Sequence, residues 1–398
     1  MRASAGLDDQ SVPALVLQSD SGAGVAQLAE RQPSKLHVAS SNLVSRSTDP
    51  STPPALGARP GPAARPALAE SAIRLRAAIA RTIHADPALI AAAAALSGAY
   101  RAGAAPLEPA GHVHDPRTAA AYAAARMPAT FAAAGRAIAE TVRNLPEFAP
   151  RTLLDVGAGT GAATWAACAV WPGLTEVTLL DRESAMTALG RRLAAQAGGP
   201  LARATWRDGS IETADPAPAD VVTAAYVLGE LDDQTRATAV ERLWAATRGV
   251  LVLVEPGSRA GFERIRAARQ ALIEAGGRVA APCPGDAACP IAGAAWCHFL
   301  VRLDRSPLQR RAKSAERSWE DEPFSYVAVA RPDAAPAPAP RVVLGRPRHR
   351  PGIVELRVCA DGRIDTRTLS RRDGPAWKGA RDLEWGDPVP TEVLAAGR

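Results

Sequence analysis

The stretch LDVGAGTG at residues 154–161 decides the fold. Its apolar start is typical of the end of a β-strand, and Gly157, Gly159 and Gly161 follow. Glycine has no Cβ and tolerates positive φ, so the backbone here can approach a ligand closely. The helix expected next offers unpaired N–H groups at its N-terminus. Taken alone, such a loop fits several nucleotide-binding folds, including dinucleotide-binding ones.

The sequence around this loop predicts an α/β domain. Between residue 151 and about residue 256, short apolar runs alternate with helical patterns, which favours a parallel sheet with helices on both faces. We expect strands at 152–156, 176–180, 204–207, 220–224 and 250–254.

Two acidic residues downstream of the loop narrow the range of possible ligands. Asp181 ends the second expected strand, where a carboxylate can accept hydrogen bonds from ribose hydroxyls, and Asp208 ends the third, where it can bind an adenine amine. This order resembles class I S-adenosylmethionine-dependent methyltransferases, which have a Rossmann-like fold. The resemblance assigns cofactor binding to Asp155, Gly157, Gly159, Gly161, Asp181 and Asp208. The alternative is that Asp181 and Asp208 only cap helices.

A catalytic signature is missing at the end of the fourth expected strand. Amino-methylating enzymes place an Asn/Asp-Pro-Pro-aromatic motif there, whereas this chain has AYVLGE at 225–230. Methyl transfer to a good nucleophile can proceed mainly by positioning, so this absence does not exclude activity. We assign no catalytic residue.

Four cysteines are candidate metal ligands: Cys283, Cys289, Cys297 and Cys359. Four sulfurs satisfy either tetrahedral zinc or an iron–sulfur cluster. The spacing lacks the C-x-x-C pairs of zinc ribbons, which favours a cluster. His298 could replace Cys359, although a histidine beside a ligand more often orients or packs. Cys168, inside an expected helix, is most simply a buried apolar residue.

A basic segment follows the cysteines, with Arg305, Arg310, Arg311 and Lys313. Arginine pairs with phosphates and stacks on bases, so an RNA-binding face is expected here, with a solvated helix face as the alternative. The net charge of +6 agrees with an acidic partner, although a GC-rich coding genome also explains the excess of arginine. Arg346, Arg348 and Arg350 form a second basic group.

These patterns divide the chain into six parts. Residues 1–65 are expected to be disordered, and they resemble the translation of a transfer RNA gene, so the true start is expected later. The other parts are a helical domain at 66–150, the methyltransferase-like domain at 151–275, a cysteine-rich metal-binding and basic insertion at 276–331, a Pro/Ala linker at 332–340 and a small β-rich module at 341–398. Within the helical domain, Tyr122 and Arg126 are spaced to share a helix face, more as a surface pair than as ligand contacts.

Several motifs together resemble one family. They are 122–130, 154–161, LVEPG at 253–257, the cysteine loop with WCHF at 296–299, RRAK at 310–313 and WGD at 385–387. The chain resembles a bacterial-type member of the Rsm22 family of ribosomal small-subunit methyltransferase-like proteins. The resemblance implies binding to the small ribosomal subunit and its rRNA, and a 4Fe-4S cluster on Cys283, Cys289, Cys297 and Cys359.

Three functions remain open from the sequence. The first is a small-subunit assembly factor that binds rRNA, S-adenosylmethionine and a 4Fe-4S cluster; the second is an active rRNA methyltransferase; the third is a small-molecule methyltransferase with structural zinc. No run approaches the roughly 20 apolar residues of a membrane helix, and no targeting segment is evident. We therefore expect a monomer in the bacterial cytoplasm, without a membrane partner.

Overall fold

A computed structural model describes residues 64–101, 115–334, 341–360 and 362–396. The chain divides into residues 1–54 and 55–398, and every described residue belongs to the second unit. The disorder expected for residues 1–65 and most of the linker expected at 332–340 therefore lie outside the described residues, apart from two residues at the start of the first helix and a short 3-10 turn, Pro332–Ala334.

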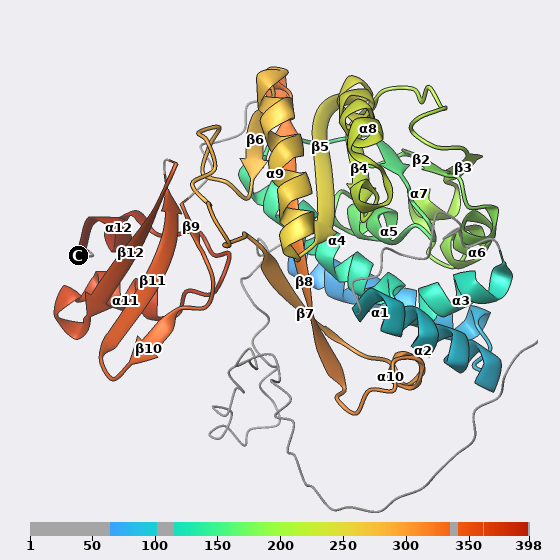
Figure 1. The fold of residues 1–398 in the computed structure, drawn as a ribbon, viewed down its shortest axis with the longest axis horizontal. Coiled ribbons are helices and arrows are strands. Elements are labelled where there is room, and N and C mark those ends of the chain that lie inside the picture. Colours follow the sequence, from blue (N-terminus) through green and yellow to red (C-terminus); the bar gives the residue numbers. More distant parts are fainter. Residues whose placement is uncertain (1–63, 102–114, 335–340, 361, 397–398) are drawn as a thin grey trace, which may run out of the picture. The chain divides into compact units, whose positions relative to one another are not determined.

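An eight-stranded mixed sheet forms the centre of the fold (Figure 1). Its strands are β1 (Thr152–Val156), β2 (Glu176–Asp181), β3 (Thr205–Asp208), β4 (Ala219–Ala225), β5 (Thr247–Pro256), β6 (Arg278–Ala281), β7 (Phe299–Asp304) and β8 (Trp319–Ala330). The order is β3-β2-β1-β4-β5-β8-β6, with β7 also paired to β8. Strands β1 to β5 are parallel, and β8 runs antiparallel to β5 and β6. This is the class I methyltransferase, Rossmann-like fold expected from the sequence.

The five predicted strands are all present, with ends shifted by at most three residues. The parallel sheet expected between residue 151 and about residue 256 is confirmed. Strands β6, β7 and β8 lie after that range and extend the sheet, with β8 reversed. The pairing of β8 joins segments far apart in the sequence, and its buried half is an apolar run without the alternation that marks a half-exposed strand.

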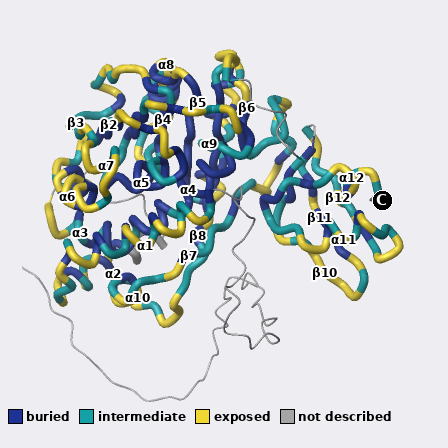
Figure 2. The backbone as a smooth tube through the Cα atoms, turned by 180° about the vertical axis from the view of Figure 1, so that it is seen from behind, coloured by how far each residue is buried: buried dark blue, intermediate teal, exposed yellow. Residues whose placement is uncertain are grey.

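Helices cover both faces of the sheet. Four belong to the N-terminal part: α1 (Ala64–Thr82), α2 (Pro87–Arg101), α3 (Pro116–Ala125) and α4 (Met127–Asn144). Five α-helices and one 3-10 turn, η1, connect the strands: α5 (Ala162–Val170), α6 (Ser184–Ala194), α7 (Gly199–Ala202), η1 (Leu228–Glu230), α8 (Asp233–Ala245) and α9 (Arg259–Glu274). One hydrophobic core includes α4 and α5, and a second includes α8 and α9. Figure 2 shows the central strands β4 and β5 among the most buried parts.

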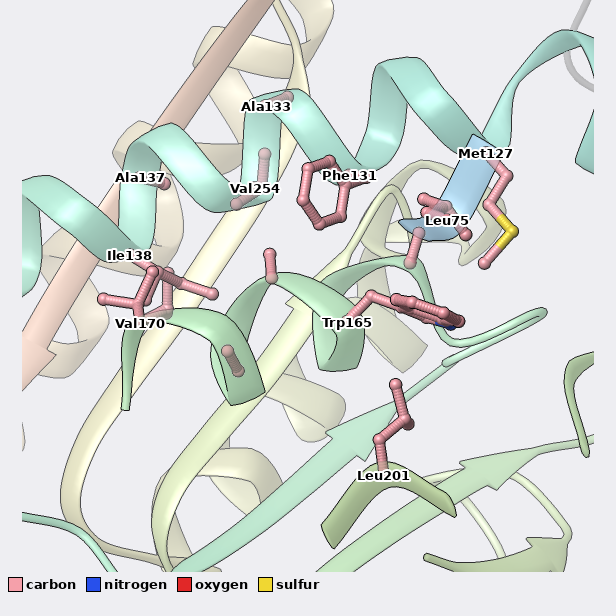
Figure 3. Close-up of a cluster of buried hydrophobic side chains, with 14 of the residues drawn as sticks. Leu75, Met127, Phe131, Ala133, Ala137, Ile138, Trp165, Val170, Leu201 and Val254 are labelled. Carbon is pink, nitrogen blue, oxygen red and sulfur yellow. The ribbon is translucent and has the colours of Figure 1, made fainter. Parts of the chain in front are cut away.

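Helix α4 is buried along most of its length and packs against α5 and directly against β5, β6, β7 and β8 of the sheet. Figure 3 shows Phe131 and Ile138 of α4 beside Trp165 and Val170 of α5, with Val254 of β5 behind them. The N-terminal helices therefore share one core with the sheet.

The helix expected around Tyr122 is interrupted. Helix α3 ends at Ala125 and α4 begins at Met127, with Arg126 between them. Pro128 explains the break, because its ring has no N–H and clashes with the carbonyl one turn earlier. Tyr122 and Arg126 consequently do not share one continuous helix, and the Arg126 side chain turns toward β8.

Two smaller pieces complete the described chain. Helix α10 (Pro307–Ala312) lies in the connection between β7 and β8. The C-terminal module has a four-stranded sheet of β9 (Val342–Val343), β10 (Arg348–Arg350), β11 (Ile353–Ala360) and β12 (Arg363–Ser370), followed by η3 (Arg371–Asp373), α11 (Pro375–Arg381) and α12 (Thr391–Ala396). Alternate residues of β11 are buried against its own small core, as the sequence alternation predicted.

Among the described residues, no helix has the length and apolarity needed to cross a bilayer.

Asp155 ties the first strand to its neighbours beneath the glycine loop. Its side chain is 1% exposed. One carboxylate oxygen accepts hydrogen bonds from the Thr164 N–H and Oγ1 of α5, at 3.2 and 2.6 Å, and the other accepts one from Thr223 Oγ1 of β4 at 2.8 Å. Burial raises the pKa of Asp155 to about 6, against the opposing effect of these hydrogen bonds.

This carboxyl group should make stability depend on pH. Between about pH 4 and pH 6 the folded protein keeps a proton that the unfolded chain has lost, so the free energy of unfolding should fall by up to about 3 kcal/mol as pH rises. Asp155→Asn should remove that part of the slope. Urea unfolding of both proteins across this range checks the prediction, and identical pH profiles would show that Asp155 is not the source.

Candidate functional site

The glycine loop bends sharply at the carboxyl end of β1. Gly157, Gly159 and Gly161 have φ values of +64°, +53° and +85°, in the left-handed region that glycine tolerates. A Cβ on Gly157 would lie 2.3 Å from a methyl group of Val227, which follows β4. The loop therefore requires glycine for both conformation and space.

A cavity of about 130 Å³ opens beside this loop. It lies where β1, β2, β3 and β4 end, which is where open α/β sheets bind ligands. Its lining includes Gly157, Gly159, Asp181, Met186, Tyr226 and Glu230. Leu96 of α2 and Tyr122 of α3 also line it, so the N-terminal helices form part of its wall.

Asp181 is the best-placed acid of this cavity. Its carboxylate accepts hydrogen bonds from the Gly159 N–H at 2.6 Å and the Glu183 N–H at 2.8 Å, which fixes it against the glycine loop. It is 8% exposed, and burial raises its pKa above the usual value despite these hydrogen bonds.

The other expected cofactor residues do not line the cavity. Asp155 supports the loop from beneath, and Gly161 packs against Leu179 and Trp206, where a Cβ would lie 3.2 Å from each side chain. The Asp208 side chain is 65% exposed, 4.0 Å from Arg191. The structure thus brings Gly157, Gly159 and Asp181 together and leaves Asp208 outside.

The end of β4 holds a buried polar network that sequence reasoning missed. Tyr226 has a φ of +64°, unusual for a residue with a side chain. Its hydroxyl donates to Glu322 of β8 at 3.1 Å, and both terminal nitrogens of Arg126 donate to the same carboxylate, at 2.9 and 3.3 Å. Burial raises the pKa of Tyr226 well above its usual value, so the hydroxyl stays protonated. Only the position of Tyr226 after an expected strand could have drawn attention to it.

The four candidate metal ligands line a second cavity, of about 60 Å³. Cys283 and Cys289 lie in the loop after β6, Cys297 precedes β7, and Cys359 is on β11 of the C-terminal module. Burial raises the pKa of Cys283, and it raises that of Cys297 further together with the nearby sulfurs of the other three. Across the described ranges, no three His, Cys, Asp or Glu side chains converge on a single point as ligands of one metal ion do.

His298 and Cys168 do not line this second cavity. His298 stacks on Trp296 and meets Trp385 edge-on, with ring centroids 5.7 and 4.6 Å away, and it does not line the cavity. Its position agrees with the packing alternative. Cys168 lies in α5, where burial raises its pKa to about 12.

The expected basic segment divides into paired and exposed residues. Arg305 and Lys313 both bind Glu320 of β8, at 2.9 and 2.6 Å, which makes them part of the internal structure of the β7–β8 connection. Arg310 and Arg311, in the last turn of α10, are exposed. Charge spacing in the sequence could not reveal Glu320 as the partner.

Comparisons with known proteins identify the family of the chain. Residues 116–390 match the family described as mitochondrial small ribosomal subunit Rsm22. The chain is 34% identical to the mitochondrial ribosome assembly protein METTL17 of Homo sapiens over 296 residues, which is 69% of this chain and 63% of that protein. It is 28% identical to the mitochondrial Rsm22-cox11 tandem protein 2 of Schizosaccharomyces pombe over 36% of this chain and 25% of that protein.

The chain therefore spans less than two thirds of the length of either relative. Among solved structures, magnesium protoporphyrin IX methyltransferase from Synechocystis with bound S-adenosylmethionine is 14% identical, with a TM-score of 0.33, over 62% of this chain and 98% of that one. Similarity at that level carries no information on function. The family match covers more than half of the sequence, and the chain belongs to the Rsm22 family.

Proposed function

We propose that the protein is an assembly factor of the small ribosomal subunit, which binds rRNA and holds S-adenosylmethionine without transferring its methyl group. The human relative is by name a ribosome assembly protein. The observation that favours binding over catalysis is the closed network of Tyr226, Glu322 and Arg126 at the end of β4.

This network leaves few free hydrogen-bonding groups that could orient a methyl acceptor. In methyl transfer the reacting atoms must come within about 3–3.5 Å of each other in an aligned geometry. The side chain that follows β4 is Tyr226, and its hydroxyl already binds Glu322, whose two oxygens also accept from Arg126. A group engaged in this way is poorly placed to orient an incoming base. An active rRNA methyltransferase remains the second candidate, favoured by the complete glycine loop and cavity.

The cofactor cavity fits S-adenosylmethionine through three residues. Gly157 and Gly159 allow close approach of the backbone, and Asp181 presents a fixed carboxylate to the ribose hydroxyls. When bound, the cofactor would supply an electrophilic methyl group, but the role proposed here is stabilisation by binding alone.

Asp181→Asn should weaken binding of S-adenosylmethionine by about tenfold or more, because a charged hydrogen-bond acceptor is lost. Asp208→Asn, at the exposed acid outside the cavity, should change it much less. Isothermal titration calorimetry at one pH checks both variants. Equal losses would mean that Asp208 also binds the cofactor.

Four thiols line the second cavity. Four thiolates are the ligands of a 4Fe-4S cluster, and they also satisfy tetrahedral zinc. The cysteine spacing lacks the C-x-x-C pairs of zinc ribbons, which favours a cluster. We therefore propose that Cys283, Cys289, Cys297 and Cys359 hold a 4Fe-4S cluster, with zinc as the alternative. Such a cluster would join the C-terminal module, through Cys359, to the insertion.

Anaerobic purification should yield a brown protein with broad visible absorption, and Cys283→Ser should lose most of that absorption and of the bound iron. Cys168→Ser, a cysteine outside the cavity, is the matched control and should keep both. Iron, sulfide and zinc analysis checks the three proteins. Stoichiometric zinc in a colourless wild-type protein would contradict the cluster.

The RNA surface is proposed at the exposed part of the basic segment. Arg310 and Arg311 lie at the end of α10. In the same β7–β8 connection the exposed Arg317 lies over the Trp319 ring, 5.2 Å from its centroid. Arg302 of β7 also lies over this ring, at 3.9 Å, but its guanidinium pairs with Asp321. Arg346 lies 4.0 Å from Asp321, so the second basic group begins next to this connection. Exposed guanidinium groups of this kind suit phosphate and base contacts.

Replacing Arg310 and Arg311 together by Ala should weaken binding to small-subunit rRNA and reduce the salt dependence by roughly 0.7 to 0.9 in log–log slope for each lost phosphate contact. The double variant Arg203→Ala and Arg207→Ala, exposed arginines near β3, is the control. Filter binding across a series of salt concentrations measures both. A slope unchanged from wild type in the first variant would remove α10 from the RNA surface.

A further inference from the structure

A buried arginine borders the cysteine cavity. Arg269 is on α9 and is 4% exposed. It lines the cavity together with Phe262, Ile265 and Arg266, which lie on the same face of the helix one and two turns earlier. Cation side chains are seldom buried to this extent without a partner of opposite charge.

Arg269 holds the loop that carries two of the cysteines. Its Nη2 donates to the carbonyls of Gly285 and Ala287, each at 2.8 Å, and both lie between Cys283 and Cys289. Its Nε is buried and has no hydrogen-bond partner among the described residues. The guanidinium thus fixes the loop and faces the sulfur-lined space.

The charge of Arg269 is uncompensated by protein. No ion pair involves it in the part of the chain that the structure describes, and the acid nearest in sequence on the loop, Asp286, pairs with Arg278 at 2.9 Å. Arg266 differs, since it pairs with Glu263 at 2.5 Å and donates to the Ile291 carbonyl at 3.1 Å. A buried cation surrounded by neutral thiols and carbonyls is costly, and an anionic centre in the cavity would offset that cost.

We propose that Arg269 is a positioning residue for the metal centre: it orders the Cys283–Cys289 loop and supplies the positive charge that balances a cluster held by four thiolates. The inference rests on the proposed cluster. A cluster with four thiolate ligands is negatively charged, and reduction makes it more so. A fixed cation beside it therefore favours the reduced state, and net charge and hydrogen bonds to sulfur are known to set the potentials of such clusters.

The test uses the full-length protein, purified anaerobically and reconstituted with ferrous iron and sulfide. Four proteins are compared: wild type, Arg269→Gln, Arg269→Lys and, as the control, Arg248→Gln, at an exposed arginine that does not line the cavity and lies 3.9 Å from Asp220. The midpoint potential is measured by dithionite titration, and cluster release is followed from the loss of visible absorption in the presence of an iron chelator. Circular dichroism of the metal-free proteins verifies that each is folded.

The proposal predicts a more negative potential and at least a several-fold faster release in Arg269→Gln. Arg269→Lys should restore the potential, because it keeps the charge, while release stays faster because the flexible ammonium lacks the planar guanidinium geometry that fixes the loop. Arg248→Gln, which removes a charge away from the cavity, should resemble wild type. If Arg269→Gln cannot be loaded although it is folded, uptake restored in Arg269→Lys supports the proposal.

Unchanged potential and release in Arg269→Gln would overturn this inference while leaving the proposed cluster intact. A wild-type protein that takes up no iron would overturn the cluster itself. The two failures are therefore distinguishable.

Discussion

Strand β8 is the element on which the rest of the structure depends. It runs antiparallel between β5 and β6, and its other half pairs with β7. Along its length it meets each functional region in turn. Glu320 binds Arg305 and Lys313 of the basic segment, Glu322 binds Tyr226 at the cofactor cavity, and Ser325 donates to the Cys297 carbonyl beside the cysteine cavity. A displacement of this strand would disturb all three regions together.

The chain has the fold of class I methyltransferases but lacks the catalytic clamp that amino-methylating enzymes with this fold carry after β4. The glycine loop and Asp181 have the geometry on which the proposed cofactor site rests. Beyond β4, where a catalytic clamp would stand, the chain places a tyrosine in a network that extends to the N-terminal helices through Arg126. Buried networks with every member hydrogen-bonded rigidify a structure. The proposed cofactor and cluster would then be two ligands that stabilise one rigid RNA-binding body, which is consistent with a role in assembly.

The predictable features are those encoded in a short stretch of sequence. The five parallel strands and the glycine loop with Asp181 follow from local patterns, and residue type alone drew attention to the cysteines. Contacts between distant segments were not predictable. Arg126 and Glu322 are 196 positions apart, and nothing near either one identifies the other. Arg305 and Lys313 looked available for RNA until Glu320 was seen beside them. No pattern in the sequence distinguishes Arg269 from the other arginines, because its partners are loop carbonyls.

Binding without turnover is the central claim, and one measurement addresses it directly. The cluster-loaded protein is incubated with methyl-labelled S-adenosylmethionine and small-subunit RNA, and the label retained on the protein and the label incorporated into RNA are counted from the same sample over time. The account predicts that the protein retains one intact S-adenosylmethionine per molecule and stays bound to the RNA. The RNA should carry no more label than in a protein-free control. Label that accumulates in the RNA with wild-type protein, and not with Asp181→Asn, would contradict it.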